Sequence, residues 1–409
     1  MLGTLPAPRY ATPAEFCDDN RRPVDSGLAL WFPAPASFTG EDVLELQCHG
    51  GPTVIALLVD AAIHLGARRA EPGEFSQRAF LNGKLDLAQA EAVADLIESG
   101  TEQAARAAHR SLSGEFSRTV DALAERLVKL RLHVEAAIDF PEEEIDFLSD
   151  TALLEQVENC RVAFDSLMDR TRSGRLLRDG LQVVIVGRPN AGKSSLLNLL
   201  SGQEAAIVTE VAGTTRDILR ERINIDGLAV ELVDTAGLRE DPDAIEAEGI
   251  RRARHALESA DVVLWIRDAS TERNDVMDES LPEGVPILTV RNKIDLTDEN
   301  PGPAKEAGTI NLSAVTGAGV DALQAALRDL AGYRDQGEGA FTARERHVEA
   351  LEIALEHFGR GRQALTEAKA GELFAEELKL AQQSLGTITG AMSSDDLLGR
   401  IFAEFCIGK

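Results

Sequence analysis

The chain has 409 residues, more than one compact core usually holds, so we expect two or three domains. A formal net charge of −27 argues against a protein that coats nucleic acid nonspecifically, and a hydrophobic content of 44% excludes wholesale disorder. No apolar run is long enough to span a membrane, no signal-peptide pattern opens the chain, and the four cysteines form no CxxC pair. We therefore expect a cytoplasmic protein with reduced thiols and no membrane segment.

Residues 1–82 alternate short apolar runs with glycine and proline breaks. Residues 28–32 and 43–47 form two such runs, and residues 52–65 have helical spacing. This alternation is typical of a small α/β or α+β domain.

Two stretches of the chain have the pattern of long helices. In residues 83–175 apolar residues recur at helical spacing, as in 120–137, and helices return in 335–409. Neither stretch alone offers a partner for its apolar stripe, so we expect one helical domain whose two halves share a core. The acidic run at 141–144 is predicted to be a solvated turn.

Residues 176–334 alternate strand-like runs with helical segments. The runs lie at 181–186, 229–233, 262–266 and 285–290. This spacing predicts a parallel sheet with right-handed crossovers. The simplest architecture is an α/β domain inserted into the helical domain.

The run at 181–186 leads into Gly-Arg-Pro-Asn-Ala-Gly-Lys-Ser at 187–194, which matches GxxxxGK[ST]. The glycines let backbone N–H groups surround phosphates, and the following helix directs its positive end at the anion. Lys193 adds charge at the β- and γ-phosphates, and Ser194 offers a hydroxyl to Mg²⁺. We expect the phosphate site to comprise Asn190, Ala191, Gly192, Lys193, Ser194 and Ser195.

Three further motifs close strand-like runs in the order of a GTP-binding protein. In the first, Asp234-Thr235-Ala236-Gly237, the aspartate would reach Mg²⁺ through water and the glycine N–H would face the γ-phosphate. In the second, Asn292-Lys293-Ile294-Asp295, the carboxylate of Asp295 can accept hydrogen bonds from the ring N–H and the exocyclic amine of guanine. Adenine would leave this carboxylate unpaired. The third, Ser313-Ala314-Val315, suits a backbone contact to the base. The four motifs together predict GTP as the ligand.

The segment between the first two motifs has the composition of a nucleotide-responsive loop. Thr215 is the natural second Mg²⁺ ligand, in a loop that the γ-phosphate would order. Position 238 is Leu, where Ras-type GTPases carry a glutamine that orients the attacking water. Hydrolysis therefore needs another polar group, and the acidic candidates are Glu240, Asp241, Asp243, Glu246 and Glu248.

Four segments of the chain together resemble the MnmE (TrmE) family of tRNA-modification GTPases. They are the P-loop Gly-Arg-Pro-Asn-Ala-Gly-Lys-Ser-Ser, the loop Ala-Gly-Thr-Thr-Arg-Asp, the segment Asp-Thr-Ala-Gly-Leu-Arg-Glu and the final Phe-Cys-Ile-Gly-Lys. The resemblance spans nearly the whole chain. It implies an N-terminal folate-binding and dimerisation domain at 1–82, and a P-loop G domain at 176–334 inserted between the halves of the helical domain. Family members open with a further segment that carries a folate-contacting arginine, and we expect this N-terminal domain to lack it.

The resemblance also implies a reaction. With MnmG (GidA), a flavin- and NADH-dependent partner, the protein would add an aminomethyl or carboxymethylaminomethyl group to carbon 5 of the wobble uridine of certain tRNAs. A formyl- or methylene-tetrahydrofolate would supply the carbon. The family forms homodimers whose two G domains meet during GTP hydrolysis with K⁺ between them, and K⁺ can neutralise transition-state charge as an arginine finger does.

Several residues take roles from this resemblance alone. Asn190 would contribute its side chain to K⁺, and the nucleotide-responsive loop its backbone carbonyls at 209, 211 and 214; the loop comprises Thr209, Glu210, Val211, Ala212, Gly213, Thr214 and Thr215. Glu246 matches the position that orients the attacking water. The folate pocket would include Glu45, Lys84 and Lys409, and the nearby thiol of Cys406 could act in catalysis or only pack.

Two other interpretations remain open. A GTPase that assembles ribosomes or binds RNA would share the G motifs but usually adds a basic module, and no segment here is strongly basic. Arginines near the second motif could still touch phosphate: Arg239, Arg251, Arg252 and Arg254. A non-catalytic GTP switch that only recruits a partner stays open because Leu238 cannot orient water.

Overall fold

The computed structural model describes residues 1–139, 151–203, 220–234, 257, 260–271, 284–332, 339–391, 401–402 and 405. The chain forms two compact units. The first combines Met1–Ala94, Ser111–Asp150 and Glu356–Lys409, and the second combines Asp95–Arg110 and Thr151–Leu355. The acidic run at 141–144 lies outside the described residues.

The N-terminal part of the first unit is a three-stranded antiparallel sheet with helices. Strands β1 (Thr12–Cys17), β2 (Pro23–Phe32) and β3 (Val43–Gln47) lie in that order, followed by helices α1 (Pro52–His64) and α2 (Glu74–Leu81). Phe16, Ala29 and Leu58 pack between the sheet and α1. The prediction of an α+β domain is confirmed, although the sequence interpretation did not include β1 or α2.

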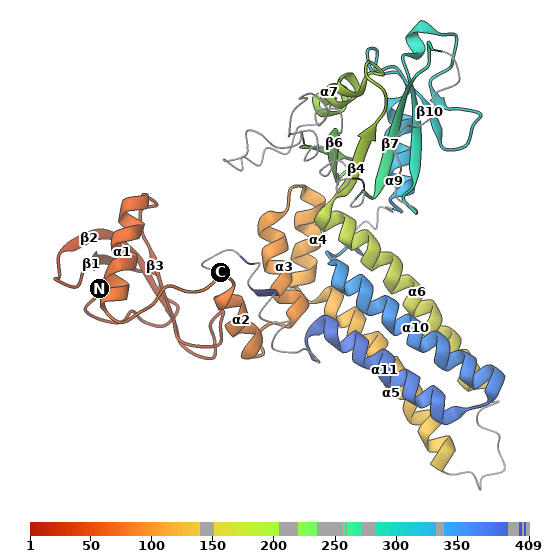
Figure 1. Ribbon diagram of the computed structural model, residues 1–409. Coiled ribbons are helices and arrows are strands. Elements are labelled where there is room, and N and C mark those ends of the chain that lie inside the picture. The colour runs from red at the N-terminus through yellow and green to blue at the C-terminus, as the bar shows by residue number, and fades with distance from the viewer. Residues whose placement is uncertain are drawn as a thin grey trace, which may run out of the picture. The chain divides into compact units, whose positions relative to one another are not determined.

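The helical region consists of long amphipathic helices. Helix α5 (Glu115–Asp139) packs along α11 (Gly371–Thr389), so segments from both helical stretches of the sequence share a core (Figure 1). Arg131 and Gln382 form a hydrogen bond of 3.2 Å across this pair. The other helices of this region whose bounds are described are α3 (Leu87–Glu98), α4 (Glu102–Leu112), α6 (Thr151–Asp179) and α10 (Glu345–Ala368).

The second unit contains a mixed sheet (Figure 1). Among the described residues it has seven strands in the order β5-β6-β4-β7-β8-β10-β9. Their bounds are β4 (Leu181–Val186), β5 (Arg220–Ile225), β6 (Leu228–Asp234), β7 (Val262–Asp268), β8 (Ile287–Asn292), β9 (Gly302–Pro303) and β10 (Thr309–Asn311).

The prediction of a parallel sheet is confirmed for the central strands, but the sequence interpretation did not include the antiparallel strands at the two edges. The five central strands pair in parallel, but β5 is antiparallel to β6, and β9 is antiparallel to β10. Asp226 and Gly227 both have positive φ, 50° and 90°, which gives the two-residue turn that a twisted hairpin needs between β5 and β6. The Asp-Gly pair was the sequence signal for this hairpin.

The loops that follow the parallel strands all lie at the end of the sheet where those strands have their carboxyl ends. Helices α7 (Lys193–Gln203) and α9 (Val320–Leu330) pack on one face, against buried side chains that include Val183, Leu264 and Val290. Because the carboxyl ends of β4, β6, β7, β8 and β10 meet at one edge, the motifs that follow these strands gather there. In the described parts of the chain, no helix combines the length and the apolar character that crossing a bilayer requires.

Candidate nucleotide-binding site

The backbone of the loop between β4 and α7 passes very close to the residue that ends β8. Gly192 has φ of 97°, and a Cβ built there would lie 2.1 Å from Nδ2 of Asn292. Any larger residue would therefore collide with a buried side chain that has little room to move. Asn190 also has a positive φ, 65°, and its side chain is exposed.

Lys193 begins α7 and bends back over the loop. Its Nζ donates hydrogen bonds to the carbonyl oxygens of Gly187 at 2.7 Å and Arg188 at 3.0 Å, and the residue is 7% exposed. The ammonium group is thus held at the loop, where it can bind phosphate oxygens. Ser194 and Ser195 are exposed in the first turn of α7, where helix N–H groups favour an anion.

Asn292 connects three loops of the site. Its Nδ2 donates to the carbonyl oxygen of Ala191 at 2.9 Å, and its Oδ1 accepts from the N–H of Ala314 at 2.9 Å. The residue is 2% exposed, so neither bond competes with bulk water. The sequence motif predicted that Asn292 belongs to the nucleotide site, but not that its amide joins the phosphate loop to the base loops.

Asp295 is oriented by a neighbouring hydroxyl. It lies in the short helix η3 (Ile294–Leu296), and Oγ of the buried Ser313 donates to its Oδ1 at 2.5 Å. The carboxylate is exposed, so it is both fixed in direction and accessible to a base. Ala314 is buried and Val315 is 80% exposed, so within this motif the Val315 side chain contributes least to the packing.

Asp268 is a residue of this site that the sequence interpretation missed. It ends β7, and its Oδ2 lies 2.6 Å from Nζ of Lys293, which has a positive φ of 68°. Burial raises the pKa of Asp268, but hydrogen bonds from Lys293 and Ser270 outweigh this effect, and its pKa lies below the ordinary value. A carboxylate at the carboxyl end of a predicted parallel strand was the available signal.

Ser194 and Asp234 are residue types whose oxygens suit a hard cation such as Mg²⁺. Strands β4 and β6 pair in parallel, and Ile185 lies opposite Asp234. Asp234 therefore lies at the carboxyl end of β6, next to the point where the loop that leads to Ser194 leaves β4. An exposed hydroxyl and an aspartate of this kind are ligands that Mg²⁺ accepts, with water filling its other positions. The described residues contain no cluster of three or more His, Cys, Asp or Glu side chains that could hold a metal by itself.

Several predicted site residues lie outside the described part of the chain. They are Thr209, Glu210, Val211, Ala212, Gly213, Thr214, Thr215, Thr235, Ala236, Gly237, Glu246, Cys406 and Lys409. In the N-terminal domain, Glu45 is an exposed residue of β3 and pairs with Leu30 of β2. Lys84 is exposed just beyond α2, and its Nζ donates to the carbonyl oxygen of Pro35 at 3.1 Å.

Solved structures similar to this chain include several GTP-binding proteins. An Era variant of Aquifex aeolicus bound to GDP·AlF4⁻ is 29% identical over 43% of this chain and 65% of that chain, with a TM-score of 0.28. The G domain of the T. maritima FeoB iron transporter is 22% identical over 37% and 98% of the two chains, with a TM-score of 0.26. This chain therefore spans about 65% of the Era chain that it matches.

Two family models cover nearly the whole sequence. The model of the GTP-binding protein TrmE N-terminus matches residues 2–84, and the model of the MnmE helical domain matches residues 87–406. These matches agree with an N-terminal α+β domain followed by a helical domain that holds an inserted mixed α/β sheet. The chain belongs to the MnmE (TrmE) family of GTPases that act in tRNA modification.

Proposed function

We propose that this protein hydrolyses GTP to serve the modification of wobble uridine in certain tRNAs in the cytoplasm. Together with MnmG (GidA), it would add an aminomethyl or carboxymethylaminomethyl group to carbon 5 of that base. The observation that carries the proposal is the site around Asn292, which joins the phosphate loop to the base loops in a chain of the MnmE family. Ribosome-assembly GTPases share the motifs, but this chain matches both TrmE and MnmE models along its length.

The described geometry supports guanine selection. The Asp295 carboxylate, oriented by Ser313, can accept two N–H groups from guanine, and Lys193 can bind the β- and γ-phosphates. Ser194 and Thr215 would bind Mg²⁺, which would supply charge neutralisation at the phosphates. Asp234 would hold the cation through water.

Hydrolysis needs a group that replaces the glutamine of Ras-type enzymes, because Leu238 cannot hydrogen-bond water. In our proposal Glu246 orients the attacking water. Asn190, whose exposed amide stands on the phosphate loop, would bind K⁺ together with backbone carbonyls of Thr209, Val211 and Thr214. A large monovalent cation suits several neutral oxygens of this kind.

The one-carbon donor would be a formyl- or methylene-tetrahydrofolate bound at the N-terminal domain. Glu45 would accept the N–H groups of the pterin, while Lys84 and Lys409 would bind the glutamate tail. Glu45 and Lys84 are both exposed, so their side chains are accessible to a ligand. Cys406 would take part in the chemistry or pack beside it.

A homodimer through the N-terminal domain is part of the proposal. Large apolar side chains stand exposed on this small domain, among them Leu44 at 44%, Ile55 at 45% and Leu57 at 50%. Burial of such side chains against a second copy would remove apolar area from water and so favour association.

Complementation of a strain that lacks its own family member tests the proposed function. Nucleoside analysis of tRNA from the complemented strain should show the modified wobble uridine, and the chain should co-purify with MnmG. Normal wobble uridines with a defect in ribosome assembly would instead favour a ribosome-assembly GTPase. GTP binding without turnover in the presence of MnmG would favour a switch that only recruits a partner.

A further inference from the structure

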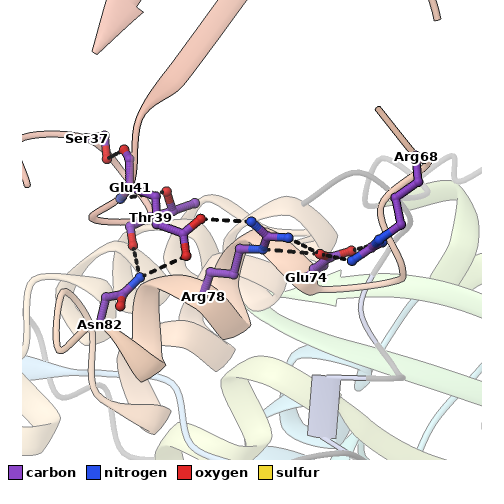
Figure 2. Close-up of polar contacts among 7 residues, drawn as sticks. All are labelled: Ser37, Thr39, Glu41, Arg68, Glu74, Arg78 and Asn82. Carbon is purple, nitrogen blue, oxygen red and sulfur yellow. Dashed lines mark hydrogen bonds and ion pairs between the residues drawn. The ribbon is translucent and has the colours of Figure 1, made fainter. Parts of the chain in front are cut away.

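The β2–β3 loop, residues 33–42, is fastened to the C-terminal half of α2 by polar side chains (Figure 2). Nδ2 of Asn82 donates to the carbonyl oxygen of Thr39 at 2.8 Å and to Oε1 of Glu41 at 3.4 Å. One guanidinium nitrogen of Arg78 donates to Oε2 of Glu41 at 2.8 Å. Thr39 is only 2% exposed, so the loop is anchored in the domain and not merely laid on its surface.

The same loop touches Lys84 directly. A Cβ built on Gly40 would lie 3.0 Å from Cβ of Asn82 and 3.3 Å from Cγ of Lys84, so the loop passes close over both side chains. Nζ of Lys84 donates to the carbonyl oxygen of Pro35 at the other end of the loop. The course of the loop therefore determines where the Lys84 side chain can lie.

Arg78 is itself held in place from the other side. Its second terminal nitrogen lies 2.6 Å from Oε1 of Glu74, whose side chain is 11% exposed. Arg68 donates to both oxygens of the same carboxylate, at 2.6 and 2.8 Å (Figure 2). Because this carboxylate fixes one branch of Arg78, the other branch reaches Glu41 with little further loss of side-chain entropy.

We infer that Asn82 and Arg78 are positioning residues for the folate pocket, an inference that rests on the proposed folate-binding function. Lys84 follows Asn82 by two residues, and β3, which carries Glu45, begins directly after the β2–β3 loop. Fastening the loop to α2 therefore fixes the two segments that supply the carboxylate for the pterin and the ammonium for the glutamate tail. A ligand that contacts both groups binds more weakly when the segments that carry them must lose conformational freedom on binding.

Calorimetric titration of the full-length protein with 5-formyltetrahydrofolate tests this inference. Asn82→Leu removes the amide at nearly constant size, and Asn82→Asp places a second carboxylate beside Glu41. Glu41→Gln weakens the contact to Arg78 and leaves the Arg78–Glu74 pair intact. Arg362→Gln, at an exposed arginine of α10, is the matched control for loss of a surface charge.

We expect Asn82→Leu and Glu41→Gln to raise the folate Kd roughly threefold to tenfold, the effect of one hydrogen bond. Asn82→Asp should raise it further, because its carboxylate repels Glu41 and cannot donate to Thr39. GTP affinity should be unchanged in all of them, and Arg362→Gln should bind folate as the wild type does. In the modification assay, the variants should raise the KM for the folate donor more than they lower kcat.

The outcomes separate this inference from the proposed function. A wild-type protein that does not bind the folate would reject the folate site itself. A wild-type protein that binds, with Kd values for Asn82→Leu, Asn82→Asp and Glu41→Gln that match the control, would overturn the positioning role. If Asn82→Asp lowers Tm strongly, Glu41→Gln decides, because a surface contact this exposed contributes little to folding.

Discussion

The side-chain amide of Asn292 donates to the backbone carbonyl of Ala191 at 2.9 Å, which ties the end of β8 to the loop between β4 and α7. Its Oδ1 at the same time accepts from the backbone N–H of Ala314. One buried side chain therefore holds together the groups that would contact the two ends of a nucleotide.

Replacing Asn292 with Ala should weaken GTP binding by at least about tenfold. The change leaves the carbonyl of Ala191 and the N–H of Ala314 without their partner, and each buried orphan costs about 1–3 kcal/mol. Titration with a fluorescent guanine nucleotide measures the effect. Asn300→Ala, at an exposed asparagine of the same domain, should bind as the wild type does; equal affinities in the two variants would contradict the linking role.

Replacing Asp295 with Asn should shift base preference from GTP towards xanthosine triphosphate. A carboxylate accepts the two N–H groups of guanine, whereas an amide can also donate to the additional carbonyl of xanthine. Competition binding with the two nucleotides measures the ratio of affinities. Asp298→Asn is the control at an exposed aspartate three residues away, and an unaltered ratio in Asp295→Asn would undercut the base-recognition argument.

GTP turnover should be faster in K⁺ than in Na⁺ at equal ionic strength. The larger cation suits a ring of neutral oxygens from Asn190 and the carbonyls at 209, 211 and 214, and it would neutralise charge in the transition state. Steady-state phosphate release in the two salts is the measurement. Asn190→Ala should reduce the difference between the salts, and equal rates in the wild type would exclude the K⁺ site.

Replacing Glu246 with Ala should nearly abolish turnover while GTP affinity stays the same. The side chain is proposed to act on the attacking water, so its loss affects the chemical step and not the bound ground state. Single-turnover hydrolysis and nucleotide titration separate the two effects. Glu248→Ala serves as the matched control, and full activity of Glu246→Ala would assign the role to another of the acidic residues.

The Glu74 carboxylate should make the N-terminal domain sensitive to acid. Arg68 donates two hydrogen bonds to it, the N–H of Glu71 and Arg78 add others, and its pKa falls from 4.5 to about 2. Since the folded-state pKa lies below the unfolded one, this stabilisation is fully present above pH 4.5 and is lost as the pH falls towards 2.

Urea unfolding followed by the fluorescence of Trp31, in a Trp265→Phe background, measures this dependence. Glu74→Gln should remove part of the loss of stability between pH 4.5 and pH 2, because an amide does not titrate. Glu15→Gln, on β1, is the control. The same pH dependence in the Glu74→Gln protein and the wild type would contradict the assignment.

The sequence by itself predicted the fold class, and it supplied most of the residues that we propose for the nucleotide site. Residues 187–194 match a phosphate-loop pattern, and the structure places strand β4 before them and helix α7 from Lys193 onward, as expected. Strand-like runs in the sequence predicted β4, β6, β7, β8 and β10, but not their order in the sheet. The helical spacing of residues 120–137 likewise predicted α5, since a local period reveals which face must be buried.

Only the tertiary structure decided which distant residues meet. Asn292 and Ala191 are separated by 101 positions, and no local pattern indicates that an amide on one loop bonds the carbonyl of the other. Two ion pairs likewise join residues that are distant in the sequence: Asp268 with Lys293, and Glu41 of the β2–β3 loop with Arg78. A sequence specifies local conformation through periodicity and turn chemistry, but a hydrogen bond between remote segments exists only once packing has brought its two partners together.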